Sequence, residues 1–181
     1  MNLKAKLKLS IDCQVGKRYS TYVRANIAKA HVLLSSPLRE LSVALVGDLK
    51  MSQLHKQFMG IPGPTDVLTF PLEKDAGGRD LAGEVIVCVP EAERQARVAG
   101  TLARDEVLLY TLHGLLHLSG FDDRTRSGFR KMHRKEDEIL SLLGIGPVFN
   151  PDDKPTAKAK SSRRMRTARQ TKRAARKAGE H

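Results

Sequence analysis

The sequence contains no tryptophan, and aromatic residues make up only 4% of its 181 positions. A protein that binds nucleic acid mainly by stacking needs several exposed aromatic rings on one surface, so this binding mode is excluded. Long apolar runs are also absent. The N-terminal stretch MNLKAKLKLSID alternates apolar and polar residues, unlike a signal peptide or a membrane-spanning helix. We therefore expect a cytoplasmic protein without a membrane partner.

Cysteine is scarce as well. Cys13 and Cys88 are the only two cysteines, and neither belongs to a CxxC pair. This spacing argues against a disulfide framework and against a thiolate metal site. We expect two reduced thiols that pack as small hydrophobic side chains.

Positive charge is abundant but unevenly distributed. The formal net charge is +12, and residues 151–181 hold eleven Lys and Arg against three Asp and Glu. This stretch has almost no large apolar side chain, so we expect one domain at 1–148 and a disordered basic tail at 149–181. The tail either keeps the protein soluble or neutralises RNA phosphates, and its charge density favours the second interpretation. The residues expected to contact RNA are Arg163, Arg164, Arg166, Arg169, Lys172 and Arg173.

The hydrophobic pattern predicts an α+β domain with a mixed four-stranded sheet, about five helices and most of its helices on one face of the sheet. Pro71 should close the third strand, and Thr101 should cap the fourth helix. This fourth helix is apolar nearly all round, so it should cross the centre of the domain. The strands are expected at 3–11, 41–46, 66–70 and 84–89, and the helices at about 18–34, 50–58, 90–100, 102–118 and 125–143.

Two histidines of the central helix indicate a metal site. His113 and His117 are four residues apart, so they share one face of the helix. Gly120 lets the chain turn back, which makes Asp123 a candidate third ligand. Two histidines and a carboxylate form a known catalytic zinc set with an open fourth position, although iron(II) and manganese also accept it. An isolated H-x-x-x-H pair is often two ordinary histidines, but the apolar helix, the glycine and the acidic residues favour one zinc ion per chain.

The remaining candidates carry weaker patterns. Asp122, next to the proposed ligand, could orient a ligand or act as a catalytic base. His31 and His55 lack a comparable context and are expected at the surface. His133 lies near the apolar face of the last helix, where a histidine at the edge of the core is the simpler interpretation.

The stretch HGLLHLSGFD at 113–122 resembles the signature H-G-x-L-H-L-x-G-[YF]-D-H of the YbeY family, metal-dependent endoribonucleases that mature ribosomal RNA. The block PTDVLTFP at 64–71 is similar to the family's PT[DN]VLSFP, and the resemblance covers about residues 3–145. The stretch Gly83-Glu84-Val85-Ile86 resembles the family's G-D-[IV]-x-I strand. The closing helix of the family is matched by Met132, Glu136, Ile139 and Leu140. The resemblance implies a single-strand-specific endoribonuclease that acts in ribosomal RNA maturation and in quality control of the small ribosomal subunit.

Two positions depart from the family pattern. The family's third metal histidine falls on Asp123, whose anionic oxygen would make the metal a weaker Lewis acid than a neutral imidazole would. The family's catalytic arginine falls on Met59, which cannot stabilise a phosphate. Candidate replacement cations are Lys56, Arg79 and Arg163.

Two other functions are compatible with these residues. The departures at Met59 and Asp123 motivate a non-catalytic ribosome-assembly or RNA-binding factor that retains the fold and the metal. A metal-dependent hydrolase of another substrate, such as a protein, is a further alternative. Zinc proteases of the H-E-x-x-H type carry a glutamate after the first histidine. That position is Gly114 here, and the basic tail also argues against a protease.

Overall fold

The computed structural model describes residues 7–146. The predicted basic tail, with its six expected RNA contacts, lies outside the described residues, as do the first residues of the predicted first strand. The boundary between domain and tail therefore stays a prediction.

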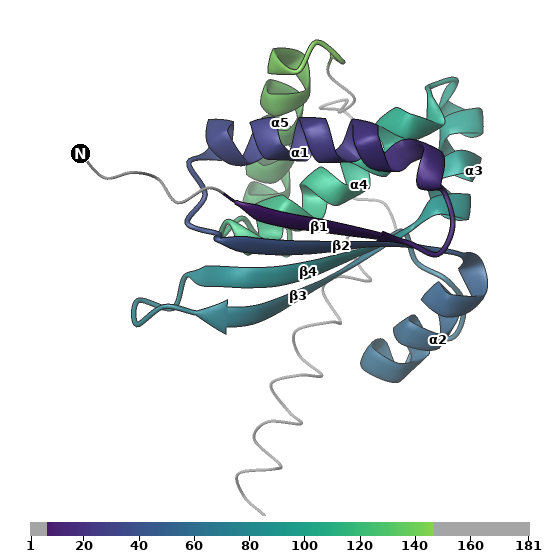
Figure 1. Ribbon diagram of the computed structural model, residues 1–181, viewed down its shortest axis with the longest axis horizontal. Coiled ribbons are helices and arrows are strands. Elements are labelled where there is room, and N and C mark those ends of the chain that lie inside the picture. Colours follow the sequence, from purple (N-terminus) through teal and green to yellow (C-terminus); the bar gives the residue numbers. More distant parts are fainter. Residues whose placement is uncertain (1–6, 147–181) are drawn as a thin grey trace, which may run out of the picture.

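Four strands form one mixed sheet in the order β1-β2-β4-β3 (Figure 1). The pairs β1–β2 and β2–β4 are parallel, whereas the β3–β4 hairpin is antiparallel. The predicted α+β architecture is confirmed. The strands are β1 (Lys8–Cys13), β2 (Glu40–Val46), β3 (Val67–Lys74) and β4 (Asp80–Cys88).

The helices pack mainly on one face of this sheet. Figure 1 shows α1, α4 and α5 on the same side of the sheet and α2 on the opposite side, near one end of the strands. A one-turn 3-10 helix at Lys17–Tyr19 precedes α1. The helices are α1 (Ser20–Leu34), α2 (Asp48–Met59), α3 (Val89–Ala99), α4 (Ala103–Leu118) and α5 (Arg126–Leu142).

Strand alternation divides the apolar side chains between two cores. In β2, Leu41, Val43 and Leu45 join the main core under α1 and α4. Val46, on the other face, joins Met51 and further residues in a smaller core beneath α2. Both faces of the sheet are thus partly covered, with the larger core on the α4 side.

Two predicted boundaries were wrong. Pro71 does not close β3, because β3 lies at the edge of the sheet, where proline is tolerated, and its pairing with β4 shifts register just after Pro71. Thr101 does not cap α4. The residue before the helix is Leu102, and the Thr101 hydroxyl donates to the Glu106 carboxylate at 3.1 Å.

His31 and His55 are buried, which corrects the prediction that they lie at the surface. A ring nitrogen of His31 donates to the carbonyl of Leu38 at 2.8 Å, and His55 donates to the carbonyl of Gly63 at the same distance. In both cases a loop that follows the helix supplies the acceptor. A buried imidazole is tolerated when a backbone carbonyl pairs with its N–H.

The central helix α4 lies close to the sheet because Gly114 has no side chain. A Cβ atom at this position would lie 2.6 and 2.7 Å from the two methyl groups of Val85 on β4. The glycine between the two histidines is therefore a packing requirement, and it brings the histidine-bearing stretch of α4 against β4.

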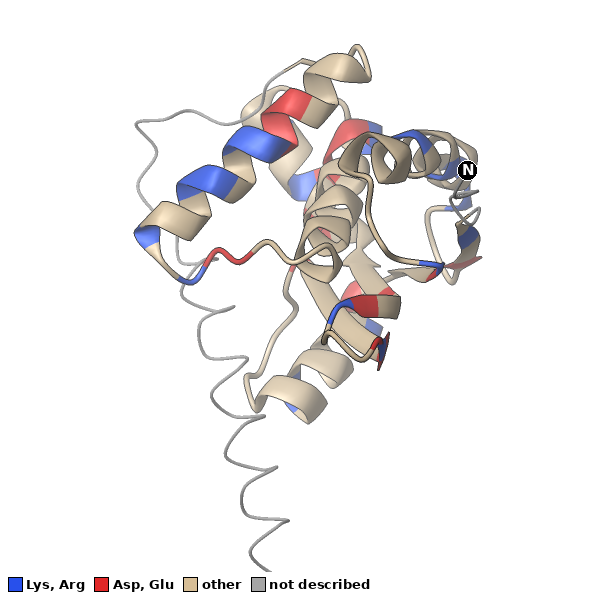
Figure 2. Ribbon diagram, turned by 90° about the vertical axis from the view of Figure 1, so that its left-hand side faces the viewer, with Lys and Arg blue, Asp and Glu red and all other residues tan. Residues whose placement is uncertain are grey.

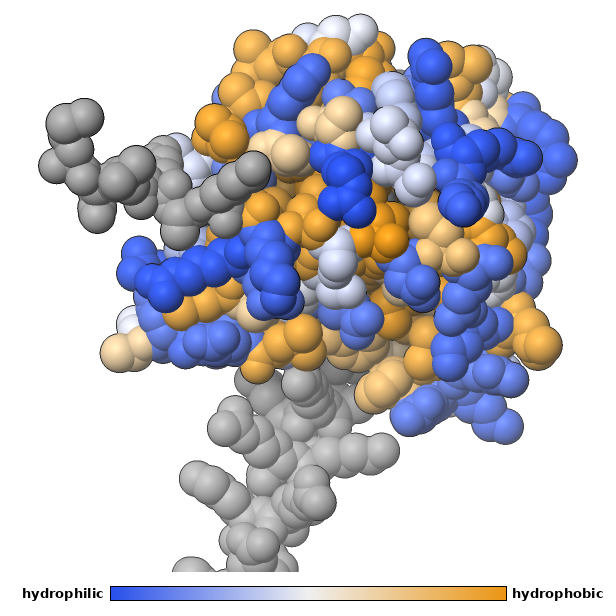
Figure 3. All heavy atoms as spheres, in the orientation of Figure 1, coloured by the Kyte–Doolittle hydropathy of each residue, from blue (hydrophilic) through white to orange (hydrophobic). Residues whose placement is uncertain are grey.

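None of the helices in the described part of the chain has the length and apolar character needed to cross a membrane. On the face shown in Figure 3, hydrophilic and hydrophobic side chains are intermixed. The large exposed hydrophobic residues are distributed over several elements: Val15, Val32, Leu33, Leu49, Phe58, Leu72, Val98, Leu102 and Leu142.

Candidate metal centre

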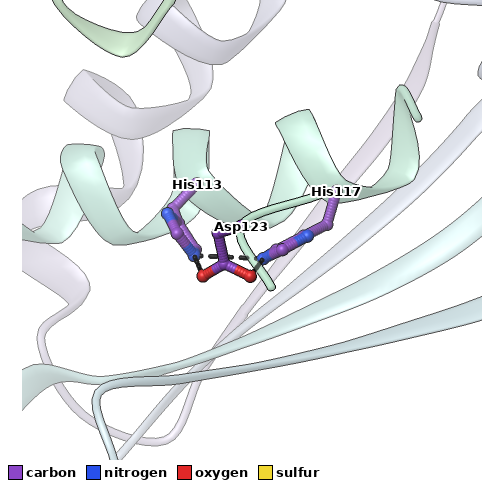
Figure 4. A group of neighbouring side chains, drawn as sticks. All are labelled: His113, His117 and Asp123. Carbon is purple, nitrogen blue, oxygen red and sulfur yellow. Dashed lines mark hydrogen bonds and ion pairs between the residues drawn. The ribbon is translucent and has the colours of Figure 1, made fainter. Parts of the chain in front are cut away.

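The predicted ligands His113, His117 and Asp123 converge in the structure. The two histidines lie one turn apart on α4, which ends at Leu118. Gly120 then adopts a φ of 95°, and its amide donates to the His117 carbonyl at 3.1 Å, so the chain reverses direction. This turn places the Asp123 carboxylate opposite the two imidazole rings (Figure 4).

The donor atoms are spaced as a small metal ion requires. The Nε2 atoms of His113 and His117 are 3.1 Å apart. Each lies 3.9 Å from one oxygen of Asp123. A tetrahedral zinc site with bonds of about 2.0–2.1 Å holds its donors about 3.4 Å apart. The ligand atoms of these three residues all lie within 4.8 Å of one another, and no other group of three or more His, Cys, Asp or Glu within residues 7–146 is as closely grouped.

The hydrogen bonds behind the rings direct three lone pairs toward one another. The Nδ1 atom of His113 lies 2.7 Å from a carboxylate oxygen of Glu136, and Nδ1 of His117 lies 3.2 Å from the carbonyl of Phe121. Both acceptors require an N–H on Nδ1, which leaves each neutral ring with a lone pair on Nε2. Two imidazole lone pairs and a carboxylate then face one another, and they need a shared cation. The residues present therefore fit a divalent metal.

Glu136 anchors this arrangement from α5. Its side chain is 2% exposed, and its second oxygen accepts a hydrogen bond from Nδ1 of His133. Burial alone would raise the pKa of this carboxyl group, but the charges and hydrogen bonds of His113 and His133 outweigh it and lower the pKa to about 2. Glu136 is thus an anion at neutral pH that orients His113, as outer-sphere carboxylates do in zinc sites.

The two candidate ligand histidines have different electrostatic surroundings. Burial lowers the pKa of His113, but the neighbouring carboxylates, Glu136 above all, reverse this effect and leave the pKa raised. The ring of His117 is hydrogen-bonded to the Phe121 carbonyl instead of a carboxylate, and the attraction of Asp123 does not offset its burial. Burial and then repulsion from His113 lower its pKa to about 4. At neutral pH His117 is therefore a neutral donor.

The three candidate ligand side chains differ in their exposure to solvent. The His113 and His117 side chains are 20% and 23% exposed, whereas that of Asp123 is 5% exposed. The carboxylate is buried in the protein while the imidazoles reach the surface. A metal held here would keep a side open to water or substrate, which catalytic sites require.

Asp122, the predicted catalytic residue, directly precedes the candidate ligand Asp123 in the chain and is hydrogen-bonded to Arg124. Its carboxylate accepts hydrogen bonds from the Arg124 backbone amide at 3.1 Å and from Nε of the same residue at 2.6 Å. The side-chain hydrogen bond and the charge of Asp122, followed by the charge of Asp123, raise the pKa of Arg124. The Arg124 guanidinium is therefore a permanent cation on the residue that follows the candidate ligand Asp123.

The cations proposed to replace the family's arginine lie in different parts of the chain. Arg79 is paired with Asp75 in the β3–β4 turn, so its charge is already partly compensated. Lys56 is exposed on α2, and Arg163 lies outside the described residues. Met59 packs against the smaller core beneath α2. The position of the family's arginine is thus apolar in both residue type and surroundings.

Sequence reasoning missed the roles of Glu136, His133 and Arg124 at this centre. One signal was present: Glu136 stands in the apolar stripe of α5 with Met132 and Ile139, where an acidic residue is unusual. Nothing local identifies its partner, because His113 is 23 residues away. The sequence around Arg124 contains no comparable pattern, because arginine is common throughout this chain.

Comparisons with known proteins identify the family of the chain. The family model described as Endoribonuclease YbeY matches residues 6–144. Endoribonuclease YbeY of Acidothermus cellulolyticus is 40% identical over 116 residues, which are 58% of this chain and 71% of that protein. Endoribonuclease YbeY of Clavibacter michiganensis is 37% identical over 139 residues, 73% of this chain and 87% of that protein. The solution structure of TM1509 from Thermotoga maritima superposes with a TM-score of 0.55 and 27% identity, covering 81% of this chain and 99% of that one.

Proposed function

Because the chain belongs to the Endoribonuclease YbeY family, we propose that it is a metal-dependent endoribonuclease. Its substrate is single-stranded RNA, and its role is the maturation of ribosomal RNA and the quality control of the small ribosomal subunit in the cytoplasm. The observation that supports metal-dependent cleavage most directly is the convergence of two imidazole lone pairs and the Asp123 carboxylate.

Each residue has a defined part in this proposal. His113, His117 and Asp123 hold one divalent ion, and the mixed nitrogen and oxygen donors favour zinc, with other divalent metals possible. When bound, the metal supplies Lewis acidity toward a phosphodiester. Glu136 fixes the ring of His113. Asp122, which precedes the ligand Asp123 in the chain, is the candidate catalytic group, and its carboxylate is paired with Arg124.

The test is cleavage of a labelled single-stranded RNA by the full chain with zinc or manganese supplied. The wild type should cut the RNA, and His117→Ala should lose at least about 100-fold in rate, because it removes a ligand. Asp122→Asn should retain metal but lose activity if Asp122 acts as the base. The proposal is wrong if the wild type leaves the RNA intact with every metal and behaves like His117→Ala.

A second function is favoured by Met59, which packs in an apolar environment and offers no cation. In this alternative the protein assists assembly of the small ribosomal subunit without cleaving RNA. Met59→Arg then creates activity that the wild type lacks. If the wild type already cleaves RNA, the alternative is wrong.

The basic tail is proposed as an additional RNA contact, on the strength of its composition alone. Substitution of Arg163, Arg164 and Arg166 by Gln should weaken RNA binding in a salt-dependent manner without altering metal content.

A further inference from the structure

Basic side chains are concentrated on α5 and on the loop that leads into it. Residues 124–135 include six Lys and Arg and no Asp or Glu. Figure 2 shows these positive positions along the first part of α5, with the acidic residues toward its C-terminal end. We call the exposed residues Arg126, Arg130, Lys131 and Arg134 the basic face of α5.

The charge order of α5 is opposite to the one that stabilises a helix. Negative side chains favour the positive N-terminus of a helix, and positive ones favour its C-terminus. The first turn of α5 contains no acidic residue, and its last turn contains no basic residue. Arg126, Arg130 and Arg134 are also spaced four apart, so like charges are neighbours. Intrahelical electrostatics therefore do not explain this arrangement.

The basic face is not neutralised by the rest of the domain. Several arginines elsewhere are paired with carboxylates, as Arg94 is with Asp48 and Glu91. Within residues 7–146, by contrast, no carboxylate forms an ion pair with Arg126, Arg130 or Arg134. The nearby Lys135 is paired with Glu138. The positive charge of the basic face is thus available to a ligand.

The opposite side of α5 is part of the metal centre. Glu136 contacts His113, and His133 contacts Glu136, while Met132 is fully buried. At the edge between the two sides, the ammonium group of Lys131 lies 5.8 Å from the centre of the Phe121 ring. Phe121 also supplies the carbonyl that holds His117. One helix therefore places the positive side chains at a fixed position relative to the candidate ligands.

We propose that the basic face of α5 binds the phosphate backbone of single-stranded RNA and guides it to the metal centre. This assignment rests on the proposed function. One basic side chain per helical turn repeats about every 6 Å, which suits successive phosphates of an extended strand. Phosphate contacts position a nucleic acid without reading its sequence, so the surface would bind many RNA sequences.

The test compares two full-length variants that lose the same charge. Arg126→Gln/Arg130→Gln/Arg134→Gln removes three cations from the basic face, whereas Lys29→Gln/Lys50→Gln/Arg97→Gln removes three exposed cations from α1, α2 and α3. Both sets, and the reference protein, carry His117→Ala so that RNA is not cut. Binding of a fluorescein-labelled single-stranded RNA is followed by anisotropy at several salt concentrations.

The α5 variant should bind at least about 10-fold more weakly, and its slope of log affinity against log salt should fall by about 2, at about 0.7 per phosphate contact. The control variant should change less than about 2-fold. Equal changes in both variants, or no change in either, overturn the assignment. A charge-conserving Arg126→Lys/Arg130→Lys/Arg134→Lys variant should retain binding, which separates charge from helix damage.

The same substitutions without His117→Ala separate this assignment from the proposed function. In the α5 variant the KM for RNA cleavage should rise about 10-fold while kcat stays unchanged, because the metal centre is intact. A wild type that does not cleave RNA contradicts the proposed function, yet the binding comparison still decides the role of α5.

Discussion

At the scale of single residues, the centre depends on which atoms each side chain leaves free. His113 and His117 are competent ligands because Glu136 and the Phe121 carbonyl occupy their Nδ1 atoms. Glu136 is therefore the residue whose removal most directly tests the tautomer argument.

Glu136→Gln should lower zinc affinity by about 10- to 100-fold, because the amide cannot supply the anionic partner that strengthens and orients His113. The measurement is competition for zinc with a chromophoric chelator. Glu138→Gln is the matched control, since Glu138 is exposed on the same helix and pairs only with Lys135 among the ion pairs of the described domain. Equal affinities for wild type and Glu136→Gln would show that this carboxylate does not tune the site.

At the scale of elements, α4 is positioned by its contact with β4. The absence of a side chain at Gly114 permits this close approach of the helix to the strand. The sheet thereby supports the histidine-bearing stretch of α4, and α5 supports it from the other direction through Glu136.

Gly114→Ala should destabilise the protein by about 1–2 kcal/mol. The new Cβ atom would overlap the Val85 methyl groups, at a cost of about 1–3 kcal/mol, and the better helix propensity of alanine offsets up to about 1 kcal/mol. The free energy of unfolding can be measured by urea titration.

Val85→Ala provides the matching control for this clash. In the double variant Gly114→Ala/Val85→Ala, the methyl groups that cause the overlap are gone, so the loss should be smaller than the sum of the single losses. Strict additivity would mean that Gly114 acts through helix propensity alone.

At the scale of the whole molecule, the metal centre links three parts of the chain. α4 supplies two ligands, the following loop supplies Asp123, and α5 supplies Glu136. An ion that binds only when these parts are together stabilises the folded chain as a unit.

Removal of the metal should therefore lower the melting temperature. With free zinc at 100 times its Kd, binding contributes about 2.7 kcal/mol, or roughly 5–10 °C for a domain of this size. The measurement is differential scanning fluorimetry of the full chain with zinc and with excess EDTA. Asp123→Ala should bind less metal by elemental analysis and show a smaller shift. A shift of equal size in both proteins would place the stabilising ion elsewhere.

The local pattern of the sequence determined much of this molecule. The spacing of His113 and His117, the glycine at 120 and the acidic residue at 123 predicted three donors that the structure brings together. These features lie within eleven residues, so helix periodicity and one turn decide their geometry. Strand alternation and helix periodicity likewise predicted the four strands and five helices, because both reflect short-range burial patterns.

Only the tertiary structure decided which side chains complete and surround the centre. The contacts of Glu136 with His113, of His31 with Leu38 and of His55 with Gly63 arise when separate elements pack, and composition or spacing does not encode them. The continuation of β3 through Pro71 depended on its place at the edge of the sheet. The position of the basic face of α5 also depends on tertiary packing, since only the fold shows that Glu136 on the opposite side of this helix contacts the candidate ligand His113. Periodicity selects the face of an element that is buried, whereas long-range contacts decide what that face meets.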